Sequence, residues 1–196
     1  MSGEHTSTSI SAQVRQVEAL LEQRGLLDAG EIDRRIDEFL AGGSPANGAL
    51  ITARAWLDVG FLARLLADAN TAIRELGLSM GGALQEQRLK VVANSGAEHH
   101  LVVCTLCSCY PIALLGPSPS WYKSEAYRSR VVRDPRGVLR EFGVELPAAT
   151  RITVWDASAE SRYMVVPRRP VGTEGMSEAK LAGLVTRNGL IGTAVL

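Results

Sequence analysis

The sequence lacks several features that would each indicate a particular class of protein. Its 196 residues carry no net charge, because 21 Lys and Arg balance 21 Asp and Glu. A chain without a basic excess is not expected to bind nucleic acid or anionic membranes. It also contains no apolar run of about 18 residues, and residues 1–11 are polar, so we expect no membrane span, no secretory signal and a cytoplasmic location.

Cysteine is also scarce, and its three copies are close together in the sequence. They are Cys104, Cys107 and Cys109. An odd number of thiols at this spacing cannot form a disulfide framework, and in a reducing compartment such a cluster indicates metal binding or redox chemistry. An apolar content of 46%, in contrast, is that of an ordinary folded chain.

Hydrophobic spacing predicts an N-terminal helical arm over residues 1–46. The arm has two short amphipathic helices, one ending at Gly25 and one over residues 32–40 before the breaker run at 42–45. Either a partner chain or the chain's own core could cover their apolar faces. The stripe on the first helix consists of Ile10, Val14, Val17 and Leu21.

Residues 47–196 predict an α+β domain, because short β-branched runs alternate with helical patterns. We expect one helix from the N-cap Asp58 to Gly77, and a last helix over 178–186 capped by Ser177. Trp56 and Trp155 are expected in the core. The predicted strands are 89–93, 101–103, 152–155 and 163–166. The predicted irregular segments are a loop braced by Pro111, Pro117 and Pro119 up to residue 125, and a turn at 134–137.

The Cys-Ser-Cys segment can bind a metal through its backbone as well as its sulfurs. The Cys107 sulfur, the amide nitrogens of Ser108 and Cys109, and the Cys109 sulfur close three fused rings of five or six atoms around one ion. Cys104 is then the axial thiolate, and one position stays open. Deprotonated amides need a strongly acidic ion, such as trivalent cobalt or iron.

Other interpretations of the cluster remain open on spacing alone. A structural zinc site normally uses four ligands in two separated pairs, and here there is no second pair. A zinc or iron–sulfur loop, or a reactive surface cluster, is about as compatible with three clustered cysteines. His99 and His100 lie on the preceding strand and point to opposite faces, so at most one of them could face a metal.

The run from Val103 to Pro111 resembles the metal-binding motif of nitrile hydratase α subunits. The resemblance implies a layered αββα domain with the metal on the proline-braced loop. It extends through further segments, which are residues 53–56, 121–123, 127–133, 154–156, 162–163, 169–170 and 184–187.

Within that family, threonine after the first cysteine marks the cobalt type, so Thr105 implies one non-corrin Co(III) per chain, with Fe(III) as the alternative. The resemblance implies that Cys107 is oxidised to a sulfinate and Cys109 to a sulfenate, while Cys104 stays a thiolate. A nitrile would bind the open position, and the Cys109 sulfenate oxygen or an activated water would attack its carbon. The product is the amide.

Residue by residue, the resemblance also carries over Gln85 to the substrate space and Arg162 to a supporting role near the site. Two positions depart from the family pattern. Ile112 replaces a pocket tryptophan, and Glu86 replaces a glycine. A smaller wall residue leaves room for a bulkier nitrile, such as the nucleoside-like substrate of the three-chain toyocamycin nitrile hydratase branch.

The resemblance further implies a β subunit, as one chain or two shorter ones, and a cobalt-delivering maturation partner. Two alternatives remain. One is the metal-binding subunit of a thiocyanate hydrolase, which bears the same motif, and the other is a non-catalytic zinc-binding subunit. Arginines between residues 128 and 140 lack interleaved aromatic platforms, so we expect them at a subunit interface. They are Arg128, Arg130, Arg133, Arg136 and Arg140.

Overall fold

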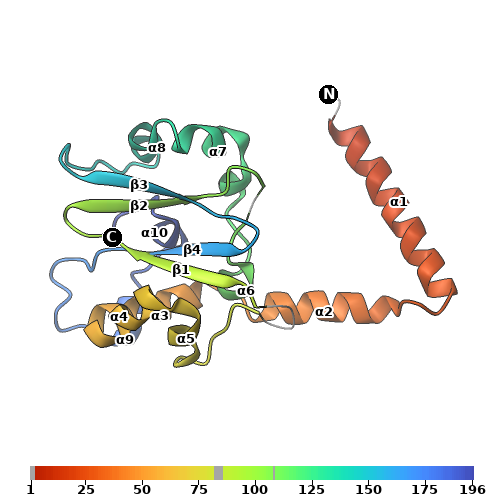
Figure 1. Cartoon of the computed structure of the whole chain (residues 1–196), viewed down its shortest axis with the longest axis horizontal. Helices are drawn as coiled ribbons and strands as arrows, with labels where there is room; N and C mark the ends of the chain where they lie inside the picture. Colours follow the sequence, from red (N-terminus) through yellow and green to blue (C-terminus); the bar gives the residue numbers. More distant parts are fainter. Residues whose placement is uncertain (1–2, 82–85, 108) are drawn as a thin grey trace. The chain divides into compact units, whose positions relative to one another are not determined.

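The structure is a computed structural model that describes residues 3–81, 86–107 and 109–196 (Figure 1). The chain divides into two compact units, Met1–Phe39 and Leu40–Leu196. The expected division of function between residues 1–46 and 47–196 stays a prediction. Among the described residues, no helix combines the length and the apolar character needed to span a membrane.

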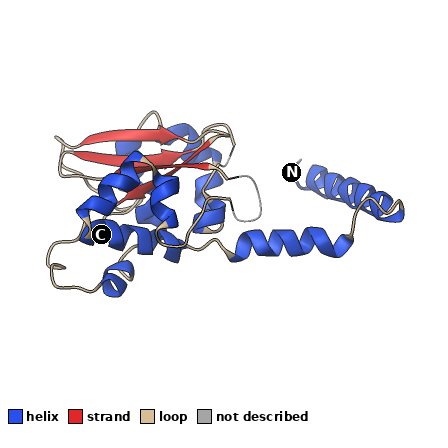
Figure 2. Cartoon of the chain, turned by 60° about the horizontal axis from the view of Figure 1, so that its bottom comes forward, coloured by secondary structure: helices blue, strands red, loops and turns tan. Residues whose placement is uncertain are grey.

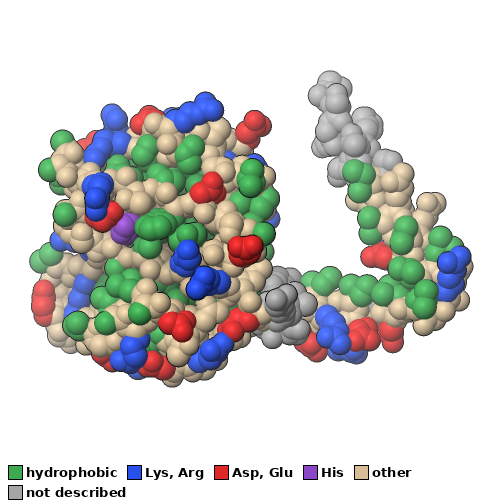
Figure 3. Space-filling view, in the orientation of Figure 1, with side chains coloured by type: hydrophobic (Ala, Val, Ile, Leu, Met, Phe, Trp, Pro, Cys, Tyr) green, Lys and Arg blue, Asp and Glu red, His purple; other side chains and the backbone are tan. Residues whose placement is uncertain are grey.

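The first unit contains the two predicted arm helices. Helix α1 spans Gly3–Gln23, and α2, Ala29–Ala41, begins in this unit. Gly25 ends the first helix with a left-handed φ of 65°, as expected for a helix C-terminus. Figure 3 shows apolar side chains along α1, and about half the surface of each remains exposed for Ile10, Val14, Val17 and Leu20.

The second unit begins with three consecutive helices. They are α3, Pro45–Leu57, α4, Val59–Ala67, and α5, Ala69–Arg74. The Asp58 carboxylate accepts a hydrogen bond from the Phe61 N–H, which confirms the predicted N-cap. The single helix predicted up to Gly77 was wrong, because Asp68 leaves the helical conformation (φ −145°, ψ 90°) and caps α5. An aspartate side chain competes for local N–H groups in this way.

Two parallel strand pairs form the centre of this unit (Figure 2). Strand β1, Arg88–Ala93, pairs with β4, Ser161–Val166, and β2, Glu98–Val103, pairs with β3, Arg151–Asp156. All four predicted strands are therefore confirmed. In Figure 1 the strands lie between one group of helices beside β3 and another beside β1, which is the mixed, layered α+β architecture that was expected.

The remaining helices correct three predictions. The proline-rich loop contains helix α6, Ile112–Leu115, and a 3₁₀ helix, Ser120–Lys123, before α7, Glu125–Val131. The predicted turn at Asp134 is the N-terminus of α8, Pro135–Glu141. Both errors have one cause, because proline is well tolerated in the first turn of a helix.

The C-terminal helix is also shorter than predicted. Ser177 caps α9, Glu178–Ala182, as expected, but the helix ends at Gly183 and Thr186 caps a second helix, α10, Arg187–Ile191. Trp56 and Trp155 are partly buried and pack against the core rather than inside it. Each indole N–H has a partner, as is usual for a half-buried tryptophan. Trp56 donates to the Pro167 carbonyl and Trp155 to His100.

Gly192 ends α10 at a point where no side chain fits. Its φ is 92°, and a Cβ atom there would collide with the His100 carbonyl oxygen of β2. We expect Gly192→Ala to lower the free energy of unfolding by about 2–4 kcal/mol, from left-handed strain and overpacking together. The control is Gly77→Ala, where φ is 72° and no atom lies within 4 Å. It should cost about 1–2 kcal/mol. Equal losses in denaturant titrations would contradict the assignment of a collision.

Candidate metal centre

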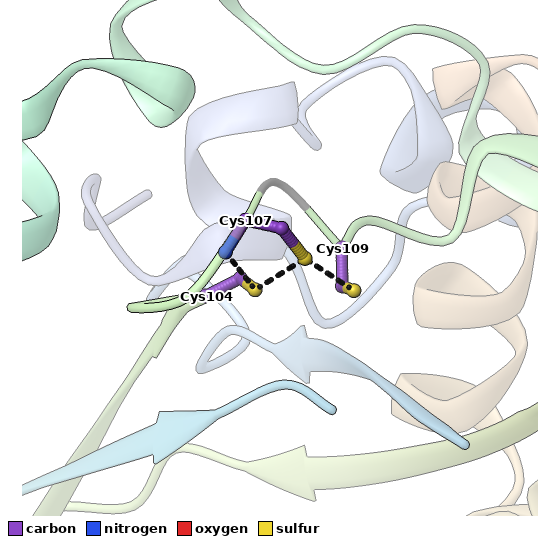
Figure 4. Close-up of side chains that lie close together, drawn as sticks. All are labelled: Cys104, Cys107 and Cys109. Carbon is purple, nitrogen blue, oxygen red and sulfur yellow. Dashed lines mark hydrogen bonds between the residues drawn. The ribbon is translucent and has the colours of Figure 1, made fainter. Parts of the chain in front are cut away.

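The three cysteines come together at the end of β2 (Figure 4). Cys104 is buried directly after the strand, Cys107 is exposed, and Cys109 is partly buried. The Sγ atoms of Cys104 and Cys107 are 3.3 Å apart, and those of Cys107 and Cys109 are 3.0 Å apart. All three sulfurs lie within 4.8 Å of one another, so one ion could contact them together.

Aromatic residues hold the far end of this loop. Tyr122 is fully buried, and its hydroxyl donates a 3.0 Å hydrogen bond to the Cys109 carbonyl oxygen. Its ring meets the Tyr110 ring edge-on at 5.3 Å. The Tyr127 ring lies 5.9 Å from the Tyr122 ring, and the Tyr127 hydroxyl donates to the Val102 carbonyl of β2 at 2.6 Å. The cysteine loop is therefore attached to the core at both ends.

The near end of the loop is held through Thr105. The Asp156 carboxylate, at the end of β3, accepts hydrogen bonds from the Thr105 N–H at 2.9 Å and from its hydroxyl at 2.5 Å. Arg128 of α7 donates to the Thr105 carbonyl oxygen at 2.8 Å. Neither Asp156 nor Arg128 was predicted to have this role. No local sequence pattern indicates these contacts, because both residues are far from Thr105 in the sequence.

Arg162 lies close enough to Cys109 to act on its charge. Burial raises the pKa of the Cys109 thiol to about 12, the hydrogen bond with Cys107 adds to this effect, and the positive charge of Arg162 opposes it. The guanidinium is buried, with Nη1 bonded to the Ser158 and Ala159 carbonyls and Nε without a partner among the described residues. A metal ion must displace the thiol protons, and such an exchange couples binding to pH.

The other predicted site residues have different outcomes. Ile112 begins α6, two residues after Tyr110, and is partly buried. Ser108 and Gln85 lie outside the described residues, so their roles as backbone ligand, catalytic group and substrate contact stay predictions.

The two histidines have structural contacts away from the sulfurs. His99 Nε2 lies 2.7 Å from the Gly192 carbonyl oxygen, and His100 accepts a hydrogen bond from Trp155 Nε1. Burial lowers the pKa of both rings. Within the described residues, the group of possible metal ligands at this site contains the three cysteines and no histidine.

Several arginines of the basic stretch have partners within the chain. Arg130 pairs with Glu141, and Arg136 donates to the Leu146, Pro147 and Thr150 carbonyls. The predicted role of this stretch at a subunit interface stays a prediction.

A wide cleft in the described part of the chain lies away from the cysteines. It has a volume of about 760 Å³ and runs along β1, where Lys90, Trp155 and Tyr163 are among its lining residues. None of the thiols lines it. The candidate site is therefore placed at the cysteines, where three sulfurs lie close enough together to contact one ion.

Comparison with known proteins agrees with this donor set. The family model described as nitrile hydratase, alpha chain, matches residues 8–194. The low-molecular-weight cobalt-containing nitrile hydratase subunit alpha of Rhodococcus rhodochrous is 48% identical over 190 residues, which are 97% of this chain and 90% of that protein.

Solved structures show the same fold. A double mutant of the Fe-type nitrile hydratase from Comamonas testosteroni Ni1 superposes with a TM-score of 0.85 at 38% identity, covering 96% of this chain and 91% of the other. A recombinant thiocyanate hydrolase with partially modified cobalt centres gives a TM-score of 0.88 at 39% identity, covering 95% and 89%. With a family model matching nearly its whole length and relatives this similar, the chain belongs to the nitrile hydratase alpha-chain family.

Proposed function

We propose that this chain is the alpha subunit of a cobalt-type nitrile hydratase, which converts a nitrile to the corresponding amide. The observation that carries the proposal is the group of three sulfurs within 4.8 Å on one loop, in a chain that matches the alpha-chain family over residues 8–194. The cobalt-containing relative at 48% identity supports cobalt as the ion.

We propose a trivalent ion, because deprotonated amide nitrogens need a strongly acidic centre. The proposed ligands are the sulfurs of Cys104, Cys107 and Cys109 together with the amide nitrogens of Ser108 and Cys109. Thiolates suit soft and borderline transition metals, and three sulfurs already lie within contact of one centre. When bound, Co(III) supplies a Lewis acid that polarises the nitrile. Its oxidation state and the ratio of one per chain remain part of the proposal, as do the oxidised states of Cys107 and Cys109.

The chain's own residues would prepare this site for a charged set of ligands. Arg162 brings a buried positive charge near Cys109, which stabilises negative charge on the sulfur in a poorly solvated place. Tyr122 fixes the Cys109 carbonyl and so restrains the direction of the adjoining peptide. We propose Cys109 and Ser108 as the catalytic residues, with Gln85 and Ile112 beside the substrate.

A partner subunit is part of the proposal. The relatives that this chain resembles are named as alpha subunits, a term that implies at least one other chain in the enzyme. We propose a beta subunit, as one chain or two shorter ones, together with a cobalt-delivering maturation partner. The arm at residues 1–46, outside the catalytic domain at 47–196, has exposed apolar side chains that such a partner could cover. A cytoplasmic location fits these partners.

The proposal can be tested on the chain purified with and without its partner subunit. We expect about one cobalt per chain with thiolate-to-metal charge-transfer absorption, and amide release from nitriles by the complex. Mass spectrometry should find oxygen added to Cys107 and Cys109. Colourless protein that contains zinc and has three unmodified cysteines would support the non-catalytic alternative and refute this proposal.

Thiocyanate hydrolysis is the second candidate function. The thiocyanate hydrolase structure superposes over 95% of this chain with a TM-score of 0.88, so the fold alone does not separate the two activities. The deciding assay offers thiocyanate and a nitrile to the same cobalt-loaded complex. Release of ammonia and carbonyl sulfide without amide formation would favour the second candidate.

The wall residue Ile112 gives a prediction on substrate size. Ile112→Trp adds a large ring at the start of α6, so we expect the ratio of kcat/KM for a bulky heteroaromatic nitrile to that for acrylonitrile to fall at least about tenfold. Ile112→Leu, which keeps the volume, should leave the ratio within a factor of about three. The measurement is the two steady-state rates on each variant. An unchanged ratio in the tryptophan variant would remove Ile112 from the substrate pocket.

A further inference from the structure

Thr105 has all of its polar groups bound by side chains from two distant elements. Its N–H and its hydroxyl donate to the two oxygens of Asp156, at 2.9 Å and 2.5 Å. Its carbonyl oxygen accepts from Arg128 at 2.8 Å. Asp156 ends β3 and Arg128 belongs to α7, so the first turn of the cysteine loop is tied to both a strand and a helix.

This arrangement follows from the register of the parallel strands. Val103, the last residue of β2, pairs with Asp156, and the next residue, Ala157, donates to the Val103 carbonyl at 2.7 Å. The backbone of Asp156 is thereby fixed beside the end of β2. Its side chain then reaches past Cys104 to Thr105. The carboxylate thus binds the backbone at Thr105, two residues beyond the end of β2, in a turn where the backbone hydrogen bonds between the strands have ended.

Packing does not hold the same part of the loop. Leu106 is 89% exposed and Cys107 is exposed as well, so few apolar contacts restrain the turn between the first two sulfurs. An exposed loop is flexible unless its backbone polar groups are bound, since ordering each residue has an entropic cost. The bonds to Thr105 supply that restraint two residues before Cys107, whose N–H donates to the Cys104 sulfur at 3.4 Å.

We propose that Asp156 and Arg128 are positioning residues that hold Thr105, and through it the sulfurs of Cys104 and Cys107, in the arrangement that captures the metal ion. This inference rests on the proposed function insofar as the loop binds cobalt. Neither side chain is among the proposed metal ligands or substrate contacts. Both act by reducing the number of conformations that the empty loop can adopt, which is the general effect of residues that orient metal ligands.

The test compares two aspartates that make the same pair of hydrogen bonds. Asp68 accepts from the Thr71 N–H at 3.2 Å and from the Thr71 hydroxyl at 2.8 Å, at the start of α5 and outside the cysteine loop. Asp156→Ala and Asp68→Ala therefore remove equivalent bonds from different places. Each is made in the full chain and purified as the reduced, metal-free complex with the partner subunit.

Two measurements are made on each complex, amide hydrogen exchange at residues 105–107 and Co²⁺ affinity by chelator competition. For Asp156→Ala we expect exchange in the loop to accelerate at least about tenfold and Co²⁺ affinity to fall about 10- to 100-fold. Asp68→Ala should change neither, although both variants should lower the unfolding temperature. Equal exchange and affinity in the two variants, or an unchanged loop in Asp156→Ala, would overturn the proposal.

Thr105 variants keep the test decisive if Asp156→Ala does not fold. Thr105→Val keeps the shape but loses the hydroxyl bond, so it should shift both readouts in the same direction by a smaller factor. Thr105→Ser keeps every bond and should behave like the unmodified chain. If the unmodified complex binds no cobalt, the proposed function fails, while loop exchange still reports whether Asp156 anchors the turn.

Discussion

Replacing Cys109 by alanine is expected to abolish both metal retention and nitrile hydration. The Cys109 sulfur closes the group of three, 3.0 Å from that of Cys107, and its loss would remove one of the three proposed sulfur ligands. Changes to residues that only orient a ligand already cost about 10- to 100-fold in affinity or activity, so loss of a ligand should cost more than about 100-fold. Elemental analysis for cobalt and an amide-release assay measure the two effects.

The matched control for this experiment is Leu106→Ala in the same loop. Leu106 is exposed and contributes no ligand atom, so its cobalt content should stay near that of the unmodified complex. If the alanine variant at Cys109 keeps full cobalt, the three-sulfur site is wrong. If both variants lose cobalt equally, any change in the loop impairs metal binding, and the result gives no support to Cys109 as a ligand.

The second large effect concerns stability and centres on Tyr122. This side chain is fully buried and contacts the rings of Tyr110, Trp121 and Tyr127. Truncating a buried aromatic ring to alanine usually costs about 3–5 kcal/mol, because both the transfer energy and a cavity are involved. We expect Tyr122→Ala to lower the free energy of unfolding by that amount, measured by denaturant titration of the complex.

Tyr122→Phe separates the ring from its hydroxyl. It keeps the packing and removes only the hydrogen bond to the Cys109 carbonyl oxygen, so the expected loss is about 0.5–1.5 kcal/mol. A phenylalanine variant as unstable as the alanine variant would show that the hydrogen bond, and not the aromatic packing, stabilises this region.

Much of this fold could be predicted because its signals are local. The β-branched runs that became β1 to β4 are visible in a few consecutive residues, and the caps Asp58 and Ser177 act on N–H groups three residues away. The cysteine cluster is equally local, since its three sulfurs meet within one turn of chain. Local patterns fix such features before any tertiary contact is known.

The errors arose where one residue type has two local uses. An aspartate can lie inside a helix or cap one. The backbone angles of Asp68 show that it ends α4 and caps α5, which the sequence pattern did not indicate. Pro135 and Pro111 were interpreted as breakers, although proline also fits the start of a helix.

The residues that hold the site could not be predicted for a different reason. Asp156 lies 51 positions beyond Thr105, and Arg128 lies 23 beyond it. Neither sequence separation has a periodic signature, because the first is set by which strands pair and the second by where α7 packs. The proposed ligands could therefore be predicted because they are close together in the sequence. The residues that hold the loop could be found only from the tertiary structure.

The separation of Thr105 from Asp156 also orders events during biosynthesis. All three thiols are synthesised before the carboxylate that lies 51 residues beyond Thr105, and contacts of such long range form late in folding. Until then the thiols lie in a segment that lacks the hydrogen bonds between Thr105 and Asp156. The anchored form of the proposed metal site is therefore available only after residue 156 has been synthesised.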